Sequence, residues 1–136
     1  MPVDTIDDLA DVFEYETIAV VGCSSTPGKA AHDVPNYLRK QGYDVIPVNP
    51  FADEIFGRPV PDSLADVESE IDIVCLFRPS EEMSEIVDAA LERDDIQVVW
   101  AQRGIRDDEA AARVEDDGRV VVQDRCMMVE HRRLAA

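Results

Sequence analysis

The most constraining feature of the chain is an apolar run that ends at a glycine, followed by a small polar loop and a helical segment. Residues 17–21 (TIAVV) are mostly β-branched, which is typical of a strand buried on both faces of a parallel sheet. Gly22 follows directly, and residues 23–29 (CSSTPGK) form the loop. This order places backbone N–H groups and a helix N-terminus where an anion can bind. The pattern therefore indicates the phosphate-binding turn of a nucleotide-binding fold.

The loop departs from both common phosphate-binding motifs. The dinucleotide motif GxGxxG would need glycine at two positions that hold Ser24 and Pro27. The Walker motif GxxxxGK[ST] fits better through Gly28 and Lys29, but its spacing is one residue too long. Ala30 also stands where that motif has its magnesium-binding hydroxyl. The loop therefore favours neither ordinary NAD binding nor ATP hydrolysis.

Predicted strands and helices alternate along the rest of the chain. We expect strands at 17–22, 44–48, 71–77, 97–101 and 120–123, and helices at 5–14, 33–41, 80–93, 107–116 and 125–134. This alternation predicts an α/β fold of the Rossmann-like, doubly wound type, a five-stranded parallel sheet with flanking helices. The expected strand order is 3-2-1-4-5. Residues 1–136 are expected to form one domain.

In such sheets the ligand binds beyond the carboxyl ends of the strands, where the strand order reverses. Four segments are expected there: 22–29, Asn49-Pro50, Phe77-Arg78-Pro79 and Gln102-Arg103-Gly104. An NAD site usually has an acidic residue after the second strand, whereas this chain has Asn49. A neutral residue tolerates the phosphorylated ribose of NADP or coenzyme A. Lys29 and Arg78 are candidate partners of phosphates. Pro50 and Phe77 are candidates to flank a base.

Five motifs lie in register along residues 15–134: IAVVGCS (18–24), GYDVIPVNP (42–50), DIV (72–74) with Phe77-Arg78, VWAQRGI (99–105) and DRCMMVEH (124–131). Together they resemble the small stand-alone CoA-binding domain proteins, which are similar to the nucleotide-binding domain of succinyl-CoA synthetase α-subunits. The resemblance implies a coenzyme A site with the diphosphate at the first loop. It implies these site residues: Gly22, Ser24, Lys29, Asn49, Pro50, Phe77, Arg78, Gln102 and Gly104.

Two further residues of the first loop and helix are candidates for phosphate contact. Ser25 offers a hydroxyl and a backbone donor beside Ser24. His32 precedes Asp33, the expected N-cap of the helix, and either contacts phosphate or supports that cap. No metal site is expected, because two isolated histidines and scattered cysteines lack ligand spacing.

The resemblance carries over binding rather than ligation. The larger synthetases use a second domain whose histidine is phosphorylated, and this chain has no room for it. We therefore expect a module that binds coenzyme A or an acyl-CoA without chemistry of its own, in a sensor, carrier or thiol-related role. The alternative is an NADP- or CoA-dependent enzyme, or the detached subunit of an acyl-CoA ligase. The protein partner is left open.

Several reactive side chains have structural explanations. Cys75 lies in an apolar strand and is expected in the core, and packing is also favoured for Cys23. Cys126 follows the last strand and is placed to line the crevice. A mixed disulfide of Cys126 or Cys23 with the coenzyme A thiol stays open. His131 is interpreted as a structural ion-pair group, and the glutamates of 81–85 as a solvated helix face.

The charge is extreme, with 30 acidic and 13 basic residues and a net charge of −17. Eighteen of the acids are aspartate, and the basic residues are eleven arginines and two lysines. Such a surface repels nucleic acid and anionic membranes. The sequence has no apolar run of about 18 residues, so no membrane span is expected. Three cysteines without close pairs indicate a reducing cytoplasm. Because concentrated salt screens carboxylate repulsion, the composition predicts a halophilic protein.

Overall fold

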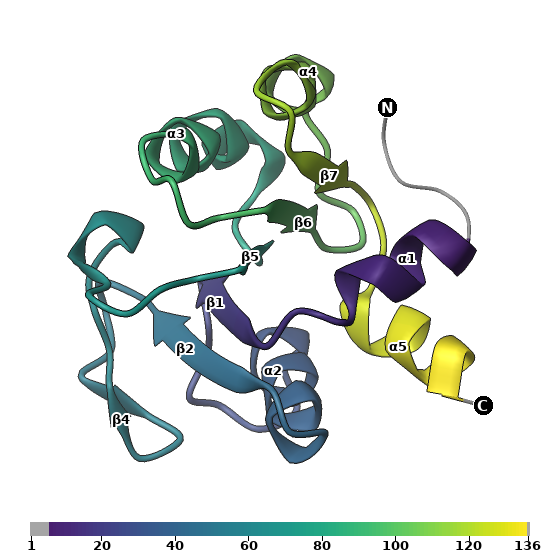
Figure 1. The fold of residues 1–136 in the computed structure, drawn as a ribbon. Helices are drawn as coiled ribbons and strands as arrows, with labels where there is room; N and C mark the ends of the chain where they lie inside the picture. The colour runs from purple at the N-terminus through teal and green to yellow at the C-terminus, as the bar shows by residue number, and fades with distance from the viewer. Residues whose placement is uncertain (1–5, 136) are drawn as a thin grey trace.

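The structure is a computed structural model and describes residues 6–135. Its main sheet has five parallel strands: β1 (Thr17–Val21), β2 (Asp44–Val48), β5 (Ile73–Leu76), β6 (Val98–Ala101) and β7 (Val120–Val122). They lie in the order β2-β1-β5-β6-β7 (Figure 1). A small antiparallel hairpin, β3 (Glu54–Ile55) and β4 (Arg58–Pro59), and the 3-10 helix η1 (Leu64–Asp66) occupy the connection from β2 to β5.

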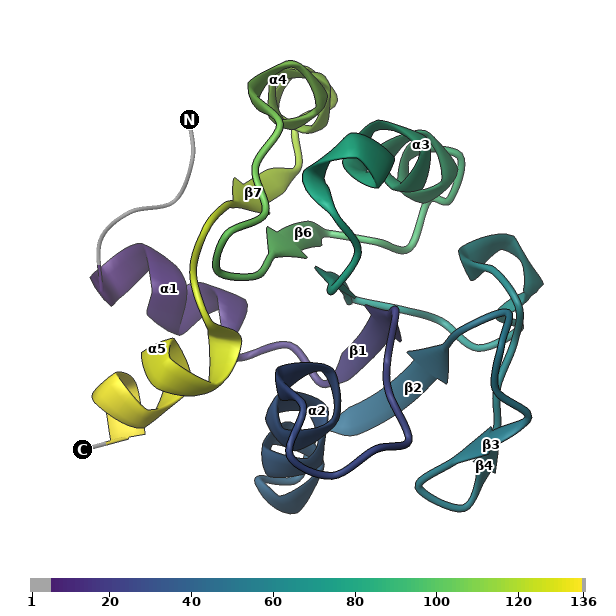
Figure 2. The ribbon, with the colours of Figure 1, turned by 180° about the vertical axis from the view of Figure 1, so that it is seen from behind.

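Helices cover both faces of this sheet. They are α1 (Ile6–Val12), α2 (Ala30–Lys40), α3 (Ser80–Leu91), α4 (Asp108–Asp116) and α5 (Met127–Ala135). Figures 1 and 2 show α3 and α4 on one face and α1, α2 and α5 on the other. Alternate strand residues supply two cores: Ala19 packs with the α3–α4 side, and Ile18 and Val20 with the other. The doubly wound α/β fold with five parallel strands is confirmed.

The strand order differs from the expected one. The third predicted strand, β5, lies between β1 and β6, so the order in the predicted numbering is 2-1-3-4-5 and not 3-2-1-4-5. All four residues of β5 are fully buried, which suits a central strand covered by helices on both faces. The Asp72 carboxylate also accepts the backbone N–H groups of Glu16 and Thr17, which joins the starts of β5 and β1. Chain order runs from β1 to β2 in one direction and from β5 to β7 in the other, so the strand order reverses between β1 and β5.

Helix α2 starts earlier than expected, and Asp33 is not its N-cap. The helix begins at Ala30, so Pro35 lies in its second turn instead of its first. A proline has no N–H, and the Ala31 carbonyl therefore loses its helical partner. The backbone N–H of Ser24 donates to that carbonyl instead, at 2.9 Å. The Asp33 carboxylate accepts the N–H of Gly28 at 3.1 Å. Both contacts hold residues 22–29, the glycine loop, against the helix.

Within the described residues, no helix combines the length and the apolar character that crossing a lipid bilayer requires.

Candidate ligand-binding site

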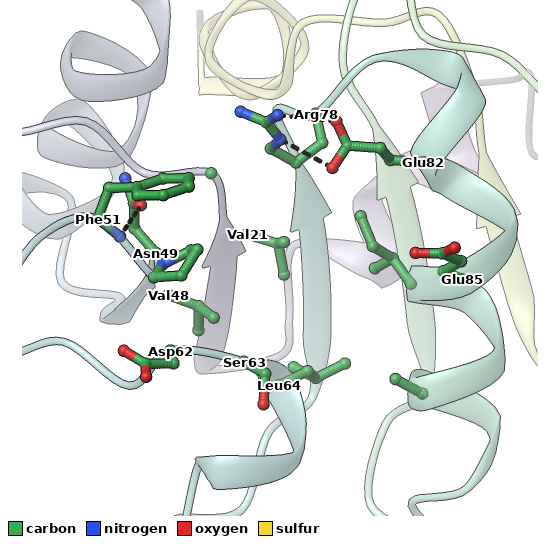
Figure 3. Close-up of a pocket in the computed structure, with 14 residues that line it drawn as sticks. Val21, Val48, Asn49, Phe51, Asp62, Ser63, Leu64, Arg78, Glu82 and Glu85 are labelled. Atoms are coloured by element: carbon green, nitrogen blue, oxygen red, sulfur yellow. Dashed lines mark hydrogen bonds and ion pairs between the residues drawn. The ribbon is translucent and has the colours of Figure 1, made fainter.

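A cavity of about 330 Å³ lies beyond the carboxyl ends of β1, β2 and β5, where the strand order reverses (Figure 3). Its apolar floor combines the last residues of two strands with residues of η1 and α3: Val21, Val48, Leu64, Ile86 and Ala89. Its polar residues are Asn49, Asp62, Ser63, Arg78, Glu82 and Glu85. An apolar pocket of this size with a few converging polar groups is typical of a small-molecule site.

Arg78 and Glu82 form an ion pair with two hydrogen bonds at the cavity. Arg78 follows β5, and Glu82 lies in the first turn of α3, so the two side chains meet across one helical turn. Arg78 Nε donates to Glu82 Oε1 at 3.2 Å, and Nη2 donates to Oε2 at 2.7 Å. These bonds raise the pKa of Arg78 and lower the pKa of Glu82. Glu81 and Glu85 are exposed, as expected of a solvated helix face, and Glu82 and Glu85 also line the cavity.

Gly22 lets the Arg78 side chain cross the end of β1. Its φ of +88° is a left-handed conformation that favours glycine. A Cβ at this position would lie 2.8 Å from Arg78 Cδ and 3.3 Å from the backbone carbonyl carbon of Phe77. The close neighbour of Gly22 is thus a side chain of the protein itself.

Asn49 holds the loop that carries Phe51. Its Nδ2 donates to the carbonyl of Cys23 at 2.9 Å, and its Oδ1 accepts the backbone N–H of Phe51 at 2.8 Å. The Phe51 side chain is 89% exposed and lines the cavity. Figure 3 shows Phe51 and Asn49 on one side of the cavity and Arg78 and Glu82 on the other. Phe51 was not predicted from the sequence, although an aromatic residue directly after Asn49-Pro50 was a usable signal.

Phe77 does not line this cavity. It is half-buried and packs against the core on the α1–α2–α5 side of the sheet. Of the two aromatic residues that follow strands β2 and β5, only Phe51 therefore faces the cavity.

Two backbone donors of the glycine loop are already paired within the protein. The N–H of Gly22 donates to the Val48 carbonyl at 2.9 Å, and the N–H of Ser24 donates to the Ala31 carbonyl. The Ser24 hydroxyl accepts the N–H of Thr26 at 3.1 Å. These contacts shape the loop and leave fewer free donors at Gly22 and Ser24 than the sequence suggested.

Ser25 and Lys29 lie on the exposed part of the same loop. Among the residues that the structure describes, the Lys29 ammonium has no hydrogen bond or ion pair, so it is available to an anion. The His32 ring lies 5.1 Å from the Phe56 ring, and its Nδ1 lies 3.3 Å from Asp33 Oδ1. Its contacts in the structure are therefore with neighbouring side chains.

Gln102 and Gly104 lie beyond β6, away from the cavity. The Gln102 side chain is buried, with Nε2 donating to Cys75 Sγ at 3.0 Å and Oε1 accepting the N–H of Met127 at 3.2 Å. The N–H of Gly104 donates to Asp124 Oδ1 at 2.6 Å. Four of the eleven predicted site residues line the cavity, namely Gly22, Asn49, Pro50 and Arg78.

The buried cysteines and His131 have structural surroundings. Cys23 and Cys75 are fully buried, as expected from packing, and burial raises the pKa of each thiol to about 12. The His131 ring packs 5.2 Å from Phe13, and Tyr37 Oη lies 2.7 Å from its Nδ1. Burial lowers the pKa of His131. The expected ion-pair role of His131 is wrong, because among the described residues its ring meets the Tyr37 hydroxyl and no carboxylate. Its neighbour Glu130 forms ion pairs with Arg125 and Arg133.

Comparison with known proteins identifies the family. Residues 16–132 match the model of the CoA binding domain family. The chain belongs to this family. The uncharacterized protein YneT of Bacillus subtilis is 40% identical over 114 residues, which are 84% of each chain. A hypothetical protein of Pyrococcus horikoshii OT3 shares the fold with a TM-score of 0.93 and 36% identity, over 100% of this chain and 97% of that one.

A larger member of this homologous group is an enzyme. The ADP-forming acetate–CoA ligase II of Archaeoglobus fulgidus is 33% identical over 85 residues, which are 61% of this chain. The aligned part is only 13% of the ligase. The chain is therefore homologous to one region of that enzyme and spans only a small part of its length.

Proposed function

We propose that the protein binds coenzyme A or an acyl-CoA, with the adenosine end in the cavity between Phe51 and Arg78, and that it is a binding module without catalysis of its own. The observation that carries the proposal is this cavity, because it lies at the strand-order reversal of a chain from the CoA binding domain family. Ligands of open α/β sheets bind at that place.

The charges around the cavity favour an uncharged group inside it. Asp62, Glu82 and Glu85 stand at the cavity, and Arg78 is already neutralised by Glu82. Carboxylates repel phosphates but accept hydrogen bonds from an amino group such as that of adenine. The exposed ring of Phe51 offers a face on which a base can stack. We therefore place the base over the apolar floor, and the phosphates outside it.

The phosphates then lie along the glycine loop. Lys29 supplies the free positive charge there, Ser25 a hydroxyl, and the N-terminus of α2 a positive dipole end. Because the N–H groups of Gly22 and Ser24 are engaged internally, Lys29 carries a larger share of the binding. Gln102 contributes indirectly, by holding the start of α5 through the Met127 N–H.

Phe51 provides a direct test of the cavity. Base–aromatic stacking is worth about 1–3 kcal/mol, so Phe51→Ala should weaken coenzyme A binding by about 5- to 150-fold, as measured by calorimetry. Tyr15→Ala is the matched control, since Tyr15 is the other large exposed aromatic among the described residues and does not line the cavity. Equal affinity of the Phe51→Ala variant and the wild type for coenzyme A would contradict the placement of the base in this cavity.

The second candidate function is a detached ligase subunit, and the homology to the ADP-forming ligase favours it. The surroundings of His131 speak against a phosphorylated intermediate on this chain, because that ring is packed among aromatic side chains. We expect the purified protein to form no ADP from ATP, acetate and coenzyme A when the reaction is followed by a coupled assay. Turnover that His131→Ala abolishes would overturn the binding-module proposal.

A further inference from the structure

A second cavity, of about 370 Å³, lies beyond the carboxyl ends of β6 and β7 and beside α5. Four arginines line it, Arg103, Arg106, Arg125 and Arg133, together with two carboxylates, Asp124 and Glu130. Four of the eleven arginines of a chain with a net charge of −17 thus gather at one hollow. Figure 2 shows the segment after β7 running past this edge of the sheet into α5.

The arginines differ in how far the protein already satisfies them. The Glu130 side chain, which is 5% exposed, accepts hydrogen bonds from Arg125 at 2.7 Å and from Arg133 at 3.0 and 3.1 Å. Arg106 pairs with Asp108 at 2.9 Å. Arg103 is exposed and has no hydrogen bond or ion pair with any other described residue. One guanidinium therefore faces this cavity with its donors unused.

We infer that this arginine cavity binds a carboxylate group. Arginine presents a planar pair of donors that matches a carboxylate, and Glu130 already shows two of these arginines holding one. Three carboxylates, Asp124 and Glu130 of the lining and Asp108 on Arg106, offset three of the four guanidinium charges. The remaining excess of positive charge suits a singly charged carboxylate better than a doubly charged phosphate, which Asp124 and Glu130 repel.

The carboxylate has two possible sources, a free acid or the acyl chain of an acyl-CoA. The second source rests on the proposed function. Both cavities lie at the carboxyl edge of the same sheet, and the N–H of Arg106 donates to Ser80 Oγ at 2.9 Å. The loop after β6, which carries Arg103 and Arg106, thus contacts the start of α3. Glu82 of the same helix lines the first cavity. A ligand that extends along this edge reaches from one cavity toward the other.

Calorimetry with acetate, which carries a single carboxylate, and with malonyl-CoA and acetyl-CoA tests the inference, using the wild type, Arg103→Gln and Arg132→Gln. Arg132 is the matched control, because it lies on α5 beside Arg133 but packs over the Tyr37 ring, outside the cavity. A charge-assisted hydrogen bond should make malonyl-CoA bind about tenfold more tightly than acetyl-CoA. Arg103→Gln should remove this preference, and Arg132→Gln should keep it.

The other outcomes separate the two proposals. Binding of free acetate that only Arg103→Gln weakens, without a preference among the thioesters, supports the carboxylate site with a free acid as its ligand. If neither acetate nor malonyl-CoA binding responds to Arg103→Gln, the inference is overturned, whether or not acetyl-CoA binds. If no thioester binds at all, the proposed function fails, while a response to acetate would still support this site.

Discussion

At the scale of single residues, the shape of the candidate site depends on contacts by which its residues fix the positions of one another. Gly22 leaves room for Arg78, Arg78 pairs with Glu82, and Asn49 ties Phe51 to the carbonyl of Cys23. Each contact joins the end of one strand to the loop or helix of another. The cavity therefore keeps its shape through polar contacts at its edge, while its floor is apolar.

Gly22→Ala should destabilise the fold more than a glycine substitution that meets no neighbour. Both the left-handed φ and the contact with Arg78 Cδ oppose a Cβ at Gly22. Gly42→Ala is the control, since Gly42 has a φ of +102° and nothing within 4 Å of the added atom. We expect Gly22→Ala to lower the free energy of unfolding by about 1–3 kcal/mol more than Gly42→Ala, measured in urea. Equal losses would contradict the role given to Arg78.

At the scale of elements, the alternation of strands and helices could be predicted from apolar runs, but their order in space could not. The strand at 71–77 was recognised because Ile73–Leu76 is apolar, yet local pattern does not say which neighbour it takes. Its central place depends on long-range contacts such as Asp72 with the N–H of Thr17. The start of α2 was missed because the helix was expected to begin at Asp33, two residues before Pro35. In the structure it begins earlier, and the N–H of Ser24 replaces the donor that Pro35 lacks at the Ala31 carbonyl.

The candidate site was predicted in part for the same reason. Gly22, Asn49, Pro50 and Arg78 follow strands, so the fold class alone brings them to one edge. Glu82 and Phe51 are set by the helix turn after Arg78 and by the Asn49 side chain, which are tertiary details.

His131 joins three helices, and its titration should make stability depend on pH. Its ring meets Phe13 after α1 and Tyr37 of α2, and burial lowers its pKa in the folded state. The unfolded chain then binds the proton more strongly, so stability is full above about pH 6.5 and falls as the pH drops below it. Unfolding in urea at several pH values should show this loss in the wild type and less of it in His131→Gln. The same slope in both proteins would assign the pH dependence to other groups.

At the scale of the whole molecule, two arginines of this strongly acidic protein join separate backbone segments through hydrogen bonds to carbonyl groups. Arg93 donates to the carbonyls of Leu64, Val67 and Ser69 and pairs with Asp95. Arg119 donates to three carbonyls at the end of α3 and beyond it, those of Ala90, Leu91 and Ile96. The planar guanidinium allows several such bonds at once, which a lysine cannot match. These hydrogen bonds leave the excess negative charge of the carboxylates in place, since the net charge is −17.

This excess predicts that salt stabilises the fold. Screening weakens repulsion among exposed carboxylates, since the Debye length falls to about 3 Å at molar ionic strength. We expect the melting temperature to rise steadily from low to molar KCl, as followed by circular dichroism. A melting temperature that stays flat or falls across this range would contradict salt adaptation.

The central claim, coenzyme A binding with Lys29 at the phosphates, is tested most directly by calorimetric titration in molar KCl with coenzyme A, NADH, NADPH and ATP. The chain offers a matched control, because Lys40 is the other lysine and lies at the far end of α2. Loss of one charge-assisted contact of about 1.5–3 kcal/mol should make Lys29→Ala bind coenzyme A about one to two orders of magnitude more weakly, with Lys40→Ala unchanged. A wild type that binds NADH and ignores coenzyme A, or equal affinities of both variants, would contradict the account.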